Sequence, residues 1–126
     1  MQPVSRPITD LPFKVGAARS TNAGGKAEIL VDLQIDATRP GFKNVNDRHT
    51  DRLRIVIYYA DGRRNYLGEE WRNLDLRLLE DTYQRFLKSG IPISISIPLK
   101  APNQILKVVI YDTESDLVGS KLIKVR

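Results

Sequence analysis

The chain has 126 residues and no cysteine, which fits one domain of typical size and excludes disulfides, thiol catalysis and cysteine-based zinc sites. No apolar run approaches the roughly 20 residues that a membrane-spanning helix needs, and residues 1–12 lack the apolar segment of a signal peptide. The net charge is +5 at pH 7, and most of the excess lies in residues 39–64, which hold seven basic and three acidic residues.

Alternation of apolar and polar residues with a period of two is the dominant pattern along the chain, and it is typical of half-buried β-strands. It predicts strands over residues 11–18, 26–36, 51–62, 70–78, 91–100, 104–112 and 117–125. In the second of these, Ile29, Val31 and Leu33 fall on one face, whereas Glu28 and Asp32 fall on the other. The sequence therefore predicts a largely β protein.

Residues 79–90 form the one segment with helical spacing, which Tyr83 and Phe86 illustrate. Gly90 stands where the C-terminal stop of a helix belongs. We expect a short helix of about two to three turns that links two strands. A longer helix that begins at Asp75 is the alternative.

Polar segments rich in turn formers are expected to connect the strands. Residues 37–50 contain proline, glycine, asparagine and aspartate, and they predict a loop. Residues 20–25 predict a turn, and Asp61-Gly62 predicts another.

Two prolines predict that the strand over residues 91–100 lies at the edge of a sheet. Pro92 and Pro98 are an even number of residues apart, so their nitrogens face the same side of the strand. Neither nitrogen carries a hydrogen that could pair with a neighbouring strand. That side of the strand cannot be fully paired.

Seven short strands with one small helix predict an all-β fold, namely an Ig-like or fibronectin III-like antiparallel β-sandwich. We expect residues 1–126 to form a single such domain, excised from a larger protein. The cysteine–tryptophan–cysteine signature of immunoglobulin domains is absent, and Trp71 is the only tryptophan.

The sequence contains no constellation typical of catalysis. His49 is the only histidine, and it lies in a polar segment in which we expect a solvated side chain. A nucleophile with its base and orienting group, a GxSxG motif and a phosphate-binding loop are all missing. We therefore expect a protein that is not an enzyme and has no catalytic residues.

The segment "YDTESDLVGS" at residues 111–120 has two interpretations. Asp112, Glu114 and Asp116 alternate, and such carboxylates bind calcium in C2-type sandwiches. Calcium needs roughly six to eight oxygen ligands, and the neighbouring loops offer few. We favour a structural turn that Asp112 caps, after which Gly119 permits close approach of another backbone. This interpretation needs no cofactor or metal; calcium binding is the alternative.

The basic region predicts a second candidate site. Arg52, Arg54, Arg63 and Arg64 could form an anion-binding patch, although such residues more often form a solvated face. Nucleic acid is a weaker alternative, because aspartates interrupt the basic run.

The order of elements from Leu76 to Val125 resembles a known family. It runs from an "LxL" strand end through a short helix ending in glycine and "IPISISIPL" to "VVIYDTESDLVGSKLIKV". This resembles the C-terminal β-sandwich region of von Willebrand factor A-related proteins of Acidobacteria, in which an aspartate and a "GS" pair mark the last hairpin. Asp112, Gly119 and Ser120 match those places.

Two departures from the family pattern accompany the resemblance. The segment "APNQ" replaces the usual proline–glycine turn and aromatic residue, and the "DxSxS" metal motif of the A domain does not occur. The resemblance implies a structural or protein-interaction module of an exported bacterial protein, located in the envelope or outside the cell. Its partner would be a protein, without membrane insertion. The alternative is a ligand-binding sandwich that binds calcium or an anionic polymer through a loop end.

Overall fold

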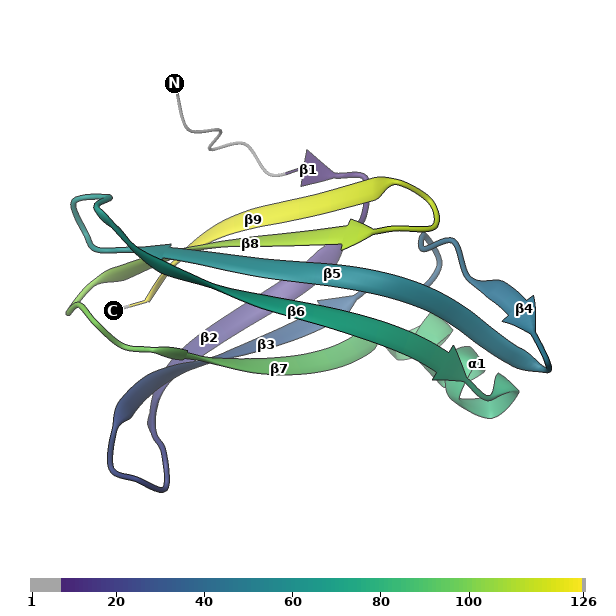
Figure 1. Cartoon of the computed structure of the whole chain (residues 1–126), viewed down its shortest axis with the longest axis horizontal. Helices are drawn as coiled ribbons and strands as arrows, with labels where there is room; N and C mark the ends of the chain where they lie inside the picture. Colours follow the sequence, from purple (N-terminus) through teal and green to yellow (C-terminus); the bar gives the residue numbers. More distant parts are fainter. Residues whose placement is uncertain (1–7, 126) are drawn as a thin grey trace.

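The computed structural model describes residues 8–125 of the chain (Figure 1). In this range the elements follow in the order β1 (Ile8–Thr9), β2 (Phe13–Thr21), β3 (Ala27–Ile35), β4 (Lys43–Val45), β5 (Arg48–Ala60), β6 (Tyr66–Leu78), α1 (Glu80–Ser89), β7 (Ile91–Pro98), β8 (Gln104–Asp112) and β9 (Leu117–Val125).

The strands form two antiparallel sheets that pack face to face (Figure 1). In the larger sheet, the strand order is β6-β5-β8-β9-β1. The short strand β4 pairs with the first residues of β5, on the same side of β5 as β8, which pairs with the later residues. The smaller sheet has the order β2-β3-β7. The predicted antiparallel β-sandwich with one short helix is confirmed.

The core lies between β3 of the smaller sheet and the β5–β8 pair of the larger one. Alternate residues of these three strands are fully or almost fully buried: Ile29, Val31, Leu33 and Ile35 in β3, Leu53, Ile55 and Ile57 in β5, and Leu106, Val108 and Ile110 in β8. Burying each such side chain stabilises the fold by roughly 1.5–3 kcal/mol. The period-two pattern therefore determines which face of each sheet turns inward.

Strand β7 is an edge strand of the smaller sheet, as its prolines predict. The amide of Leu99, just beyond the strand, donates to the carbonyl oxygen of Ala27 at 3.3 Å. Odd-numbered amides therefore point toward β3, and the nitrogens of Pro92 and Pro98 point away from it. The missing hydrogens fall on the unpaired side of the strand, where their loss has no cost.

This geometry gives a prediction for hydrogen exchange. The amides of Ser94 and Ser96 share the unpaired side with the two prolines, so we expect them to exchange much faster than those of Val31 and Leu33 in the central strand β3. Residue-resolved exchange by NMR measures both sets in one sample. Equally slow exchange in both sets would contradict the edge position.

Helix α1 links the two sheets at one end of the sandwich (Figure 1). It begins at Glu80, directly after β6, so the alternative of a longer helix from Asp75 is wrong. Gly90 ends the helix with φ 88°, and its amide donates to the carbonyl oxygen of Phe86 at 2.8 Å. The partly buried side chains of Phe86 and Leu87 pack against the core.

The segment 37–50 is not entirely a loop, which corrects the sequence prediction. Strand β4 and the start of β5 form a hairpin there, and Asn46 and Asp47 at its turn have φ values of 51° and 62°. Asparagine and aspartate tolerate this left-handed conformation better than most residues. The hairpin extends beyond the core, so its residues lack the alternation of apolar and polar side chains by which half-buried strands are recognised. Strand β6 likewise begins at Tyr66 rather than at residue 70.

Strand β6 is the exposed edge of the larger sheet, and it carries a charged pair on its inner face. Glu70 and Arg72 are opposite the buried residues Ile57 and Ile55 of β5, so they point toward the core side. Arg72 Nη1 lies 2.9 Å from Glu70 Oε2. Inward-pointing charges on an edge strand discourage pairing with another chain.

Candidate functional site

The outer face of the larger sheet carries a group of aromatic and apolar side chains. Val56 of β5 is directly opposite Trp71 of β6 on one side and Val109 of β8 on the other. Tyr58 and Tyr66 extend the group toward the β5–β6 turn. Trp71 is 51% exposed, Tyr66 65% and Tyr58 36%. These five residues are called the aromatic face below.

Glu69 orients the two most exposed rings of the aromatic face. The indole Nε1–H of Trp71 donates to Glu69 Oε2, and the hydroxyl of Tyr66 donates to Oε1 at 2.7 Å. The hydrogen bond to Glu69 also raises the pKa of Tyr66, because a phenolate beside a carboxylate is disfavoured. The polar ends of both rings are thus bound by one carboxylate, while their apolar surfaces stay open to solvent.

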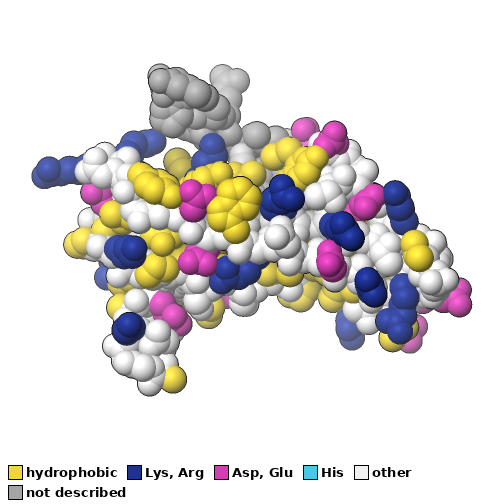
Figure 2. Space-filling view, in the orientation of Figure 1, with side chains coloured by type: hydrophobic (Ala, Val, Ile, Leu, Met, Phe, Trp, Pro, Cys, Tyr) yellow, Lys and Arg dark blue, Asp and Glu magenta, His cyan; other side chains and the backbone are white. Residues whose placement is uncertain are grey.

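Figure 2 shows hydrophobic side chains gathered over β5, β6, β8 and β9, with charged side chains around them. Large exposed rings surrounded by polar residues mark protein-interaction sites more often than scattered single apolar residues do. Tryptophan and tyrosine are also the residues that contribute most to binding energy in such sites. The aromatic face therefore has the composition of a binding surface.

A basic cleft lies at the β4 end of the same outer face. Thr50 of β5 is opposite Lys43 of β4 and Arg77 of β6, and Arg48 and Arg52 are two residues away on either side. These four basic residues and Thr50 line one cleft of about 870 Å³. Figure 2 shows dark-blue side chains at this end, with acidic ones between them.

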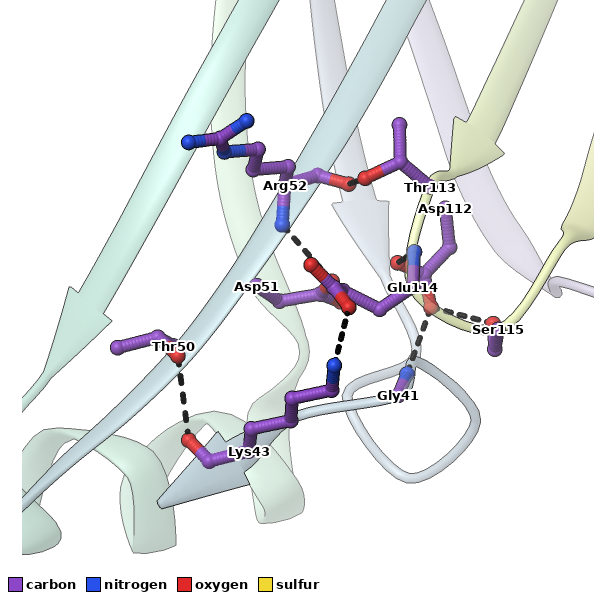
Figure 3. Close-up of polar contacts among 9 residues, drawn as sticks. All are labelled: Gly41, Lys43, Thr50, Asp51, Arg52, Asp112, Thr113, Glu114 and Ser115. Carbon is purple, nitrogen blue, oxygen red and sulfur yellow. Dashed lines mark hydrogen bonds and ion pairs between the residues drawn. The ribbon is translucent and has the colours of Figure 1, made fainter. Parts of the chain in front are cut away.

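Two buried carboxyl groups lie beneath the cleft (Figure 3). Asp51 is 3% exposed and Asp112 is 0% exposed. Asp112 Oδ2 accepts hydrogen bonds from the Gly41 amide at 2.6 Å and from the Ser115 hydroxyl, and its Oδ1 accepts one from the Glu114 amide at 3.2 Å. Burial opposes ionisation of Asp112, but hydrogen bonds from Asp51 and these donors together keep its pKa below the usual value.

Burial makes Asp51 the member of this pair that is harder to ionise. Its Oδ1 accepts the amide hydrogen of Arg52 at 2.8 Å, whereas its buried Oδ2 receives no hydrogen from any N–H or O–H group among residues 8–125. Burial, followed by the hydrogen bond to Asp112, raises the pKa of Asp51 to about 8. At neutral pH the protonated Asp51 therefore donates to the ionised Asp112, and the pair holds one negative charge.

A short turn follows β8. The amide of Asp116 donates to the carbonyl oxygen of Asp112 at 2.9 Å, and Asp112 also binds the turn through its side chain. A Cβ atom at Gly119 would overlap the carbonyl oxygen of Leu11, so Gly119 does allow close approach of another backbone. The neighbouring segment is fixed there by the Leu11 amide, which donates to the carbonyl oxygen of Val118 at 3.2 Å.

The carboxylates of this turn have separate partners. Glu114 Oε2 lies 2.8 Å from Lys43 Nζ, and Asp116 accepts a hydrogen bond from the hydroxyl of Tyr111. Between residues 8 and 125, no group of three or more histidine, aspartate or glutamate side chains is placed to hold a metal ion. Glu114 and Asp116 are thus each engaged by a side chain of the chain itself.

The prediction of a solvated His49 is wrong. Its side chain is 16% exposed, and its ring stacks on Tyr83 with the ring centroids 3.7 Å apart. His49 Nε2 lies 3.2 Å from Glu80 Oε1 of α1. The ring therefore packs β5 against the helix. The sequence could not reveal this packing role, because Tyr83 and Glu80 come close to His49 only through the position of α1 in the fold.

The structure separates the four arginines of the predicted anion patch. Arg52 and Arg54 lie on the outer face of β5, whereas Arg63 and Arg64 lie in the β5–β6 turn. The six residue-to-residue steps from Arg54 to Ala60 span about 20 Å of extended strand. Arg52 instead joins the basic cleft, which the sequence did not reveal because Arg77 approaches through strand pairing alone.

No protein-family model matches the chain, and a search of curated proteins finds none similar to it. In the described range, no helix is long and apolar enough to cross a membrane.

Proposed function

We propose that the chain is a non-catalytic β-sandwich module that binds a protein partner through its aromatic face. The observation that carries this proposal is the half-exposed Trp71, held by Glu69 beside Val56 and Val109. A rigid ring over an apolar floor loses little conformational entropy on binding and buries a large apolar area. Protein partners exploit such anchors, with a polar rim around them.

The strand order supports an Ig-like or fibronectin III-like origin of the module. The sheets β2-β3-β7 and β6-β5-β8-β9 follow the order that A-B-E and C′-C-F-G strands have in such sandwiches. This agrees with the resemblance to the C-terminal sandwich of von Willebrand factor A-related proteins of Acidobacteria. On that resemblance the module belongs to an exported bacterial protein and acts in the cell envelope or outside the cell.

A non-catalytic role agrees with the chemistry of the described side chains. The ring of His49 is engaged by Tyr83 and Glu80, and within residues 8–125 no hydrogen bond joins it to a serine or threonine hydroxyl. The proton shared by Asp51 and Asp112 lies in a buried pair whose remaining oxygens are occupied by backbone and side-chain donors. The hydrogen bonds to Asp112 connect the turn after β8 to the segment at Gly41.

Site-specific photocrosslinking tests the proposal. Trp71 is replaced by p-benzoylphenylalanine in the natural protein in its producing cells, and Leu30 is replaced likewise as a control. Leu30 is a 36% exposed apolar residue of β3, on the other sheet. We expect a discrete covalent adduct with another polypeptide, or with another part of the same protein, from position 71 only. Adducts of equal yield from both positions, or none from position 71, would reject the aromatic face as the binding surface.

A further inference from the structure

The basic cleft has the geometry of an oxyanion site. Thr50 is surrounded by basic residues on all four sides in the plane of the sheet, with Lys43 and Arg77 across the strands and Arg48 and Arg52 along β5. Directly opposite residues in an antiparallel pair are about 5 Å apart, and residues two apart on one strand are about 7 Å apart. All four side chains can therefore reach a ligand above Thr50.

Two of the four basic groups are already held in place by acidic neighbours. Lys43 Nζ lies 2.8 Å from Glu114 Oε2, and Arg52 Nε lies 3.4 Å from Asp75 Oδ1. Arg48 and Arg77 have no ion-pair partner among the residues that the structure describes. An anion above Thr50 would thus meet two uncompensated guanidinium groups.

The floor of the cleft adds little opposing charge. Asp51 lines the cleft but carries the proton that it shares with Asp112. The single negative charge of the pair is stabilised by hydrogen bonds from the amides of Gly41 and Glu114 and from the hydroxyl of Ser115. Unpaired arginines beside a buried pair with a single, hydrogen-bonded negative charge favour an anionic ligand over a cation.

We propose that the cleft binds the tetrahedral oxyanions, phosphate or sulfate, of an anionic polymer. Arginine supplies planar pairs of N–H donors that match such oxygens, and three of the four basic residues are arginines. The hydroxyl of Thr50, which now donates to the Lys43 carbonyl oxygen at a long 3.3 Å, is a further donor. A cleft of about 870 Å³ is far larger than one oxyanion, so it accommodates a ligand that carries several.

The basic cleft is separate from the aromatic face, so either proposal can be rejected without rejecting the other. Calorimetric titration of the chain with tripolyphosphate and with a heparin tetrasaccharide at low salt tests whether the cleft binds oxyanions. The double variant Arg48→Gln/Arg77→Gln removes the unpaired guanidinium groups. Arg63→Gln/Arg64→Gln removes the same charge from the β5–β6 turn and is the matched control. All four side chains are exposed, and thermal unfolding verifies that both variants fold.

We expect at least one of the two probes to bind the natural chain. The Arg48/Arg77 variant should bind it about ten-fold more weakly or worse, as expected for losing charge-assisted hydrogen bonds. The Arg63/Arg64 variant should stay within about two-fold, because remote charges are screened. Binding of tripolyphosphate without binding of heparin would assign the site to phosphate, and binding of heparin without binding of tripolyphosphate would assign it to sulfate. Equal weakening in both variants, binding of neither probe, or equally tight binding of a glutamate oligopeptide would overturn the proposal.

Discussion

Replacing Asp51 with asparagine is expected to make the protein more stable at neutral pH than the natural chain. The amide nitrogen of the new side chain would donate to Asp112 in place of the shared proton, and its oxygen would still accept the Arg52 amide. The natural chain must retain a proton on Asp51 in the folded state, although the unfolded chain releases it well below neutral pH. The asparagine variant has no such requirement.

The direction of the pH dependence follows from the raised pKa of Asp51. Its pKa is about 8 in the folded state against an ordinary value of 3.8, so the folded state binds one proton more than the unfolded state between these values. Stability should therefore fall as pH rises from about 4 to about 8, at about 1.4 kcal/mol for each pH unit, and level off above. The lowered pKa values of Asp36, Asp61, Glu80 and Asp112 act in the opposite direction, near and below their ordinary values of 3.8 and 4.5.

Urea unfolding at several pH values between about 4 and about 9 measures this slope. The Asp51→Asn variant should lose most of it, and its advantage over the natural chain should grow with pH. Asp75→Asn is the control, because Asp75 is an exposed partner of Arg52 on the neighbouring strand. Natural-chain stability that is constant or rising across this range would refute the shared proton.

Replacing Gly119 with valine should give the second large effect, a loss of stability of about 3 kcal/mol or more. The new Cβ would overlap the carbonyl oxygen of Leu11, a backbone atom. The amide of Leu11 donates to the carbonyl oxygen of Val118, and this hydrogen bond holds the segment against β9. Relief would require separating the segment around Leu11 from β9.

Gly16→Val is the matched control for this substitution. Gly16 also lies within a strand, β2, but a Cβ there would meet no atom within 4 Å. Valine suits a strand, so we expect little change or slight stabilisation. Thermal unfolding compares the two variants directly. A melting temperature for Gly119→Val as close to the natural value as that of Gly16→Val would mean that the backbones do not approach as described.

The sequence predicts the elements that bury an apolar face and fails where no face is buried. The alternation in β3, β5 and β7 reveals strands because each has one side in the core. The β4–β5 hairpin extends past the core, so residues 43–50 carry no such signal. Gly119 was recognisable because a glycine within a strand pattern often marks a close backbone approach.

The sites depend on strand pairing, which residue order does not reveal. The alternation of residues 51–57 already places Asp51 on the buried face with Leu53, so an unusual buried carboxyl could have been noticed. Its partner Asp112 follows only from the pairing of β5 with β8, in which Leu53 is opposite Asp112. The group of Trp71, Val56 and Val109 likewise requires the order β6-β5-β8.

The most direct test of the aromatic face uses the single tryptophan as a probe. In a chain labelled with 5-fluorotryptophan, Trp71 gives the only fluorine signal, and an unlabelled partner contributes none. We expect the free chain to show the large solvent isotope shift, between water and deuterium oxide, of an exposed ring. The complex with the partner that crosslinks to position 71 should show a displaced signal with little isotope shift. An unchanged signal at saturating partner would contradict binding through the aromatic face.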